Sequence, residues 1–137
     1  MTNTYEMAVQ VAKDDLDELH HVNNVRYVQW VQDIAKEHWI SYAPKEVQDN
    51  VVWVLLRHHI NYKSEAKYKD LVKMKTYVAK TEGAKSIRIV EMYNDTTKEP
   101  LVHSETEWCL LNAKSLRPIR VSEEIKKVFE KKKSTAN

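Results

Sequence analysis

Glycine, cysteine and long apolar runs are all scarce in this sequence of 137 residues. Gly83 is the single glycine, which excludes the glycine-rich loops that bind phosphates in nucleotide and dinucleotide sites. Cys109 is the single cysteine, so no intrachain disulfide can form, and its apolar setting predicts a buried structural thiol. No apolar run approaches the roughly 20 residues that span a bilayer, and the first residues lack the pattern of a signal peptide. We therefore expect a cytoplasmic protein without a membrane partner.

The overall composition is that of a globular protein with a nearly balanced charge. The formal net charge is +2, which gives no indication of a nucleic-acid partner. The hydrophobic fraction of 42% is enough for a packed core, and the charged fraction of 31% suits a solvated surface. We expect one domain over residues 1–137, in which the lysine-rich tail 131–137 is a frayed end.

Periodicity predicts one strand, one long helix, four further strands and a short terminal helix. The long helix begins near Asn23 or Asn24, either of which could be its N-cap, and it has ended by Pro44. Ser122 is the expected N-cap of the terminal helix, which runs to about Lys131. The predicted strands are 5–12, 51–62, 71–80, 86–93 and 101–112. This order predicts an α+β fold with the long helix packed across one face of an antiparallel sheet.

Two segments carry predictions about burial. The long helix has a 3.6-residue apolar period, which predicts a buried face. That face consists of Tyr27, Val28, Val31, Ile34, Ala35 and Trp39. Strand 51–62 begins with so many branched and aromatic residues that we expect it to be covered on both faces.

The polar stretch directly before the long helix is the best candidate for a chemical site. It reads DLDELHHVNNVRYVQW from Asp15 to Trp30 and brings Asp15, Asp17, His20 and His21 close together in sequence. A carboxylate at this place can be a general base, a nucleophile, or a loop residue that accepts backbone hydrogen bonds. Spacing alone does not separate Asp17 from Asp15 in this role.

Other candidate groups lie between the second and third strands. Glu65 is a carboxylate in the segment YKSEAKYKD, which without a functional role would be an ordinary charged loop. Lys63 and Lys67 surround it and could offer positive charge to the phosphates of a substrate, although a solvated turn explains them as well.

The histidine pattern does not favour a metal site. Histidines occur in two adjacent pairs, at 20–21 and 58–59, and neighbouring side chains usually diverge, as they do on a strand. We therefore expect neither a metal nor another cofactor.

The stretch before the helix resembles the signature of hotdog-fold thioesterases, in the branch that includes 4-hydroxybenzoyl-CoA thioesterases and plant acyl-ACP thioesterases. The matching positions are Asp15, Asp17, His21, Val22, Asn23, Asn24, Tyr27 and Trp30. The order of strands and helix is also similar, over about residues 4–120. The resemblance implies a hotdog fold, in which about five antiparallel strands wrap around the long helix. It also implies hydrolysis of acyl-CoA or acyl-ACP to a free acid and a thiol.

The resemblance assigns catalytic roles at four positions. Asp17 matches the catalytic aspartate, which acts as general base or nucleophile, and His21 matches the histidine of the plant enzymes. The backbone N–H of Asn24 matches the oxyanion donor, and Glu65 matches a second carboxylate.

Two positions depart from the plant pattern. Leu19 replaces a catalytic asparagine, and Ala66 replaces a cysteine. Because the asparagine–histidine pair of the plant enzymes is incomplete, we expect a mechanism that depends on Asp17. The incomplete pair also motivates a competing hypothesis, a non-catalytic module that binds acyl thioesters on the same fold. A hotdog dehydratase fits less well because its histidine and acid are placed differently.

The resemblance further implies an oligomer, either a homodimer or a homotetramer. The acyl group would lie beside Tyr27, Trp30 and Val31, at the junction of two subunits. If these three side chains have no role in binding, they are ordinary residues of the hydrophobic core. A long strand such as 51–62 would need a covering or pairing partner if it lay at an edge of the sheet.

Overall fold

The computed structural model describes residues 2–130 of the chain. Its regular elements are β1 (Thr4–Gln10), a 3-10 turn (Lys13–Asp15), α1 (Asn24–Tyr42), α2 (Lys45–Asn50), β2 (Val51–Tyr62), β3 (Leu71–Glu82), β4 (Lys85–Asn94), β5 (Pro100–Asn112) and α3 (Glu123–Val128). The five predicted strands and the two predicted helices are confirmed. The tail 131–137 lies outside the described residues.

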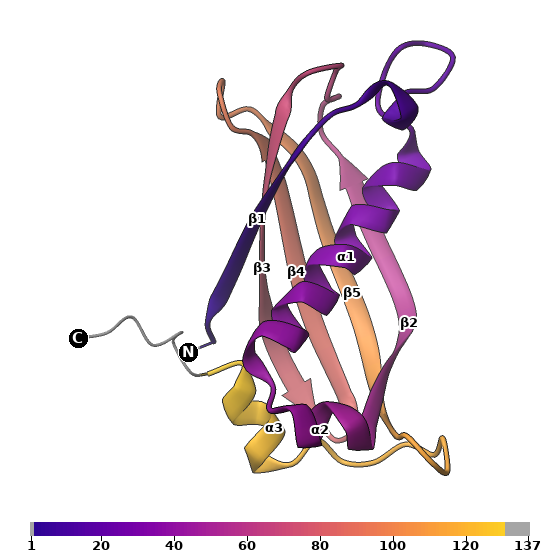
Figure 1. Ribbon diagram of the computed structural model, residues 1–137, viewed down its shortest axis with the longest axis vertical. Helices are drawn as coiled ribbons and strands as arrows, with labels where there is room; N and C mark the ends of the chain where they lie inside the picture. Colours follow the sequence, from indigo (N-terminus) through magenta and orange to yellow (C-terminus); the bar gives the residue numbers. More distant parts are fainter. Residues whose placement is uncertain (1, 131–137) are drawn as a thin grey trace, which may run out of the picture.

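The five strands form one antiparallel sheet in the order β1-β3-β4-β5-β2. Figure 1 shows α1 running diagonally across one face of this sheet, with α2 and α3 at the end where α1 finishes. The predicted α+β layout is confirmed. No helix within residues 2–130 is both long and apolar enough to cross a lipid bilayer.

Local sequence explains where α1 begins and ends. The Asn23 side chain accepts a hydrogen bond from the Val25 backbone N–H at 3.0 Å, so Asn23 is the N-cap. At the other end Pro44 follows Ala43 and serves as the N-cap of α2, a short helix that periodicity did not predict. Six residues are too few for a clear apolar period, since only Val47 in α2 is buried.

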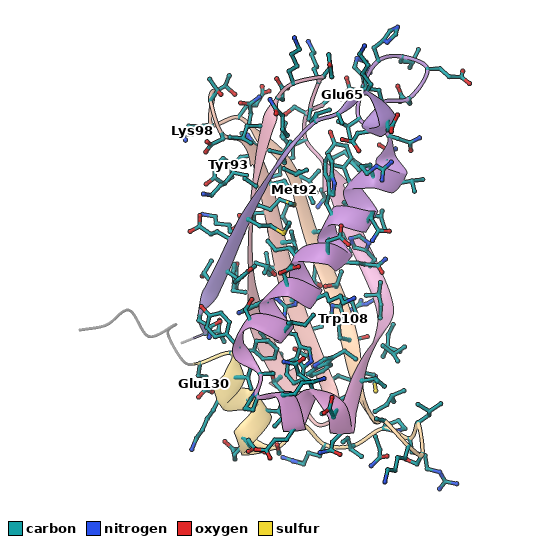
Figure 2. All side chains as sticks on the ribbon, viewed as in Figure 1. Glu65, Met92, Tyr93, Lys98, Trp108 and Glu130 are labelled. Carbon is teal, nitrogen blue, oxygen red and sulfur yellow. The ribbon has the colours of Figure 1, made fainter. Side chains whose placement is uncertain are left out.

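The buried face of α1 is rotated slightly from the predicted face. Its buried residues are Tyr27, Trp30, Val31, Ile34, Ala35 and His38. Val28 and Trp39 are only half-buried, which corrects the prediction. The apolar period gives the direction of the buried face, but the position of the sheet decides which flanking residues are covered. Met92, labelled in Figure 2, belongs to the same core as Tyr27 and Trp30.

Strand β2 lies at the edge of the sheet and is covered on one face only. Val52, Val54 and Leu56 are 38%, 40% and 50% exposed, while Val51 is buried against the helical side. The prediction that both faces are covered is therefore wrong for the single chain. No second layer among residues 2–130 covers the outer face of β2. The apolar side chains on that face therefore form an exposed strip at an open edge of the sheet.

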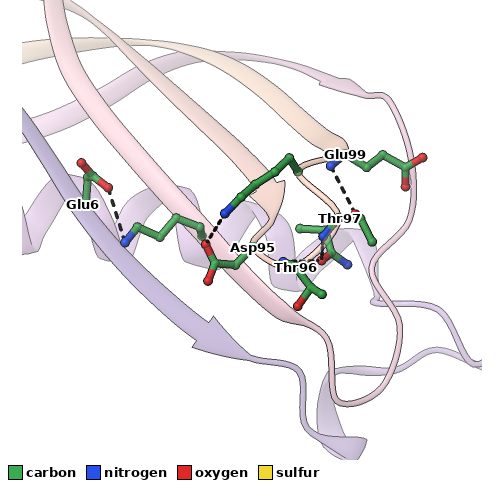
Figure 3. A network of polar contacts seen from close by, with 8 residues as sticks. Glu6, Asp95, Thr96, Thr97 and Glu99 are labelled. Carbon is green, nitrogen blue, oxygen red and sulfur yellow. Dashed lines mark hydrogen bonds and ion pairs between the residues drawn. The ribbon is translucent and has the colours of Figure 1, made fainter.

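Two turns between strands have the residues that their backbone geometry needs. Gly83 connects β3 to β4 with a φ of +62°, a conformation that glycine adopts without strain. In the turn between β4 and β5, shown in Figure 3, the Asn94 side chain accepts from the backbone N–H groups of Thr96 and Thr97 at 2.9 and 3.1 Å. Lys98 then takes a left-handed φ of +67°. Both turns contain residue types that favour turns.

Candidate active site

The stretch before α1 folds back on itself as a short hairpin. The Asn23 N–H donates to the Asp15 carbonyl at 2.8 Å, and Leu16 forms a bridge with Val22. The Asp17 N–H then donates to the His21 carbonyl at 2.7 Å. The hairpin holds Asp17 and His21 side by side at its tip, next to the residues that start α1.

The hairpin gives Asp15 and Asp17 different roles, which their spacing in the sequence could not distinguish. Asp15 uses both carboxylate oxygens: Oδ1 lies 2.9 Å from Nε of Arg26, and Oδ2 accepts from the Ala12 N–H at 2.8 Å. Its side chain is mostly buried. Asp15 therefore ties the first turn of α1 to the end of β1, and its oxygens are not available to a substrate.

Asp17 keeps one oxygen available. Its Oδ1 accepts from the backbone N–H groups of Leu19 and His21 at 2.8 and 3.2 Å. Within residues 2–130 no group donates to Oδ2, and the residue is only half-buried. The two bonds fix the orientation of the carboxylate while leaving Oδ2 free to meet water or a carbonyl carbon.

Leu19 supports this arrangement through its backbone, and its side chain is exposed. At the tip of the hairpin His20 has a left-handed φ of +63° and is exposed. Within residues 2–130 neither side chain forms a hydrogen bond or ion pair with the Asp17 carboxylate.

The segment around Glu65 pairs with the hairpin although it lies far away in sequence. The backbones of His21 and Lys67 form an isolated antiparallel β-bridge, and the Val22 N–H donates to the Ala66 carbonyl at 3.2 Å. This pairing brings Glu65 Oε2 to 3.2 Å from His21 Nε2. The structure thus gathers Asp17, His21 and Glu65, and these are three of the four predicted catalytic positions.

Asn24, the fourth position, is the first residue of α1. Within residues 2–130 its backbone N–H has no acceptor, as expected for the first N–H groups of a helix. Such a group carries part of the positive end of the helix dipole. It is a preorganised donor for a developing negative charge.

The three predicted acyl contacts are core residues in the single chain. Tyr27, Trp30 and Val31 are all buried between α1 and the sheet. The Tyr27 hydroxyl accepts from the Ala66 N–H at 2.9 Å, and burial, as the main cause, raises the pKa of the phenol. Tyr27 therefore anchors the segment that carries Glu65.

The lysines near Glu65 are exposed. Lys63 donates its backbone N–H to Leu101 at 2.8 Å, and Lys67 donates its backbone N–H to the Asp70 carboxylate at 2.8 Å. No ion pair of their ammonium groups is found in the described part of the chain. Both ammonium groups are free to meet an anion near the hairpin.

No group of three or more potential metal ligands occurs among residues 2–130. His58 is half-buried beside Ser104 at 2.7 Å, whereas His59 is exposed, so this pair diverges as predicted for a strand. Burial lowers the pKa of His58, with a smaller contribution from His59.

Comparison with known proteins decides the family. The family model for the acyl-ACP thioesterase N-terminal domain matches residues 2–129. The chain belongs to the acyl-ACP thioesterase family. It is therefore a thioester hydrolase, as the resemblance implied. No curated protein sequence matches the chain.

Solved structures confirm the hotdog fold. A 1,4-dihydroxy-2-naphthoyl-CoA thioesterase from Synechocystis superposes with a TM-score of 0.80 at 12% identity, covering 92% of this chain and 95% of that one. A Staphylococcus aureus protein in complex with CoA gives 0.82 at 12% identity, with coverage of 98% and 90%. The 12:0-ACP thioesterase from Umbellularia californica gives 0.80 at 13% identity, with coverage of 94% and 51%.

Sequence reasoning missed one feature that the structure shows clearly. Arg88 on β4 points to the helical side of the sheet and is buried there, beside a cavity. The available signal was its position in strand 86–93, where Ser86, Arg88, Val90 and Met92 share one face. Either face of this strand could have been the inner one, so the sequence did not single out Arg88.

Proposed function

We propose that this thioesterase hydrolyses acyl thioesters of CoA or acyl carrier protein with Asp17 as its general base. The free Oδ2 of Asp17 is the observation that carries the proposal, because the competing Asp15 has both oxygens occupied. Direct attack by the same oxygen, through an acyl-enzyme anhydride, is the alternative mechanism.

The reaction follows from the groups around the hairpin. Oδ2 of Asp17 takes a proton from water as the water oxygen bonds to the thioester carbon. The carbonyl oxygen becomes an oxyanion, which accepts a hydrogen bond from the Asn24 N–H. One such donor typically contributes about 10²–10³ in rate. The oxyanion then collapses, the C–S bond breaks, and the thiolate takes the proton from Asp17, so that the carboxylate is regenerated.

A thioester needs only modest assistance at the leaving group. A thiol has a pKa of about 8.5, so the thiolate departs readily without prior protonation. This supports a site that has a base and an oxyanion donor but no separate acid. His21 and Glu65 then act as positioning residues, because the contact between their side chains joins the hairpin to the segment after β2.

The substrate carrier is proposed from charge and from relatives. Lys63 and Lys67 place two exposed cations on the Glu65 segment, where phosphates of CoA or of a carrier's prosthetic arm could bind. The Staphylococcus aureus relative is a CoA complex, and the Umbellularia californica relative is named for an ACP substrate.

We also propose that the active form is at least a homodimer, joined along β2. Val52, Val54 and Leu56 leave an apolar strip beside an unpaired strand edge. A second copy paired along this edge would cover the strip, and the acyl site predicted beside Tyr27, Trp30 and Val31 would lie near this junction of two subunits.

The test compares three carboxylate-to-amide variants by thiol release from short, medium, long and aromatic acyl-CoAs. Asp17→Asn should lower kcat by about 10²–10⁴ while the unfolding transition stays close to wild type. Glu18→Gln changes an exposed neighbour without an observed side-chain contact and should keep full activity. Asp15→Asn should lower stability, because it weakens the contacts with Arg26 and Ala12.

Full activity of Asp17→Asn would overturn the assignment of the base. Tight binding of acyl-CoA without turnover by the wild-type chain would favour the non-catalytic module instead.

A further inference from the structure

A cavity of about 460 Å³ lies between the second half of α1 and strands β2, β4 and β5. Its walls include four aromatic rings: Trp39, Trp53, Trp108 and Phe129. In Figure 2 Trp108 lies in the lower half of the molecule, whereas Glu65 lies at the upper end. Within one chain the cavity is therefore separate from the Asp17 hairpin.

The cavity wall contains a buried cation. Arg88 is only 5% exposed, and its Nη1 donates to Nδ1 of His38 at 2.9 Å and to the Thr76 hydroxyl at 3.0 Å. Burial lowers the pKa of Arg88 to about 9, so the guanidinium is still charged at neutral pH. The pKa of His38 is lowered to about 3 by burial and then by Arg88, so the imidazole is neutral and supplies no charge.

No carboxylate in residues 2–130 pairs with this guanidinium. The Phe129 ring lies under it, with the guanidinium carbon 5.3 Å from the ring centre. Asp33 and Lys36 also line the cavity from α1, but their charges oppose each other, and Asp33 Oδ1 accepts from the Gln29 amide at 2.8 Å. A buried charge without a partner is costly, so the arrangement calls for an anion.

A second donor in the same wall is also unsatisfied. Among the described residues, Trp53 Nε1 is the one buried side-chain nitrogen or oxygen that has no hydrogen-bond partner. Trp108 is a useful contrast, because its Nε1 donates to the Thr106 hydroxyl at 2.8 Å. Buried polar groups are usually paired, so an orphan indole N–H in the lining that also contains an unpaired cation points to a missing acceptor.

We propose that this cavity binds a free organic acid whose carboxylate pairs with Arg88 and Trp53. Nε and Nη2 of the guanidinium have no acceptor in the described chain, and unlike Trp53 Nε1 they are not among the fully buried unpaired atoms, so they can meet a ligand at the cavity surface. The tryptophan and phenylalanine rings would surround an apolar body of one or two rings, and the volume falls within the usual range of ligand sites. None of the residues to which we assign a role in thioester hydrolysis lines this cavity, so that reaction does not account for the site.

The experiment uses the whole chain and two probes of the same shape. Cyclohexanecarboxylate carries the charge, and cyclohexanecarboxamide is its neutral counterpart. Neither absorbs where tryptophan does, and three of the four tryptophans line the cavity, so fluorescence together with calorimetry reports binding. The carboxylate should bind about tenfold to a hundredfold more tightly than the amide at pH 7.5.

Variants test which groups recognise the charge. Arg88→Met should abolish the preference for the carboxylate. Trp53→Phe keeps an aromatic ring but removes the orphan donor, so carboxylate affinity should fall roughly tenfold. Trp108→Phe is the matched control, since its N–H already has a partner, and it should keep the preference.

Three results would overturn the proposal. The first is no binding of the carboxylate, and the second is equal binding of the two probes. The third is an equal loss of preference in Trp53→Phe and Trp108→Phe. The third comparison decides the question even if Arg88→Met does not fold.

Discussion

The Tyr27 hydroxyl offers a sharp test of how the candidate site is held together. It accepts a hydrogen bond from the Ala66 N–H at 2.9 Å, and both residues are buried. Tyr27→Phe removes the acceptor but keeps the ring, so the Ala66 N–H is left without a partner in an apolar core. The cost of such a group is about 1–3 kcal/mol.

That loss should be measurable in two ways. For a chain of this size, a loss of about 2 kcal/mol corresponds to a fall in Tm of roughly 6–12 °C. Urea denaturation at pH 7.5 gives the free energy of unfolding directly. Thiol release should also fall, because the Ala66 segment carries Glu65, which pairs with His21.

Tyr62→Phe is the matched control. The Tyr62 ring lies 5.7 Å from the Tyr27 ring, but Tyr62 is exposed, and in the described chain its hydroxyl has no hydrogen bond. It should change the free energy of unfolding by less than about 0.5 kcal/mol. If Tyr27→Phe also stayed within this limit, the argument that Tyr27 anchors the Glu65 segment would be refuted.

Three further predictions concern other parts of the chain. Because burial lowers the pKa of His38 to about 3, the neutral form is native, and stability is lost as the pH falls below about 6.5. Urea denaturation should show that this group lowers the free energy of unfolding by about 2 kcal/mol when the pH falls from neutral to about 5. His38→Gln should remove this loss, and parallel pH profiles of the wild type and the variant would contradict the prediction. Ser122→Ala removes the side chain that accepts from the Ile125 N–H at 3.2 Å, and it should cost about 1 kcal/mol by thermal unfolding; an unchanged Tm would show that the cap is not needed. Val54→Lys places a charge on the exposed strip of β2, so light scattering should show a shift from dimer to monomer. The activity assay should show reduced thiol release by the same variant. A wild-type chain that is already monomeric would refute the proposed dimer.

The elements of the fold were readable because they leave local patterns. The period of α1, the alternation of β3 and the turn residues Gly83 and Asn94 each depend on a few neighbouring residues. Even so, α2 was too short to be detected. The buried face of α1 was misjudged at Val28 and Trp39, because the flanks of a buried face depend on where the sheet lies.

The sequence by itself determined the long helix, the order of the strands and the stretch in which the chemistry was expected, because each of these is encoded within a short window. Only the tertiary structure decided which aspartate is free. Arg26 and Ala12 occupy Asp15, and these contacts depend on how the hairpin meets β1 and α1.

The pairing of Glu65 with His21 likewise depends on two distant segments lying side by side. The tertiary structure also decided that Arg88 is buried without an opposite charge paired to it among residues 2–130. A charge becomes significant when it is buried, and burial is set by which face of β4 meets α1, which no local pattern of that strand specified.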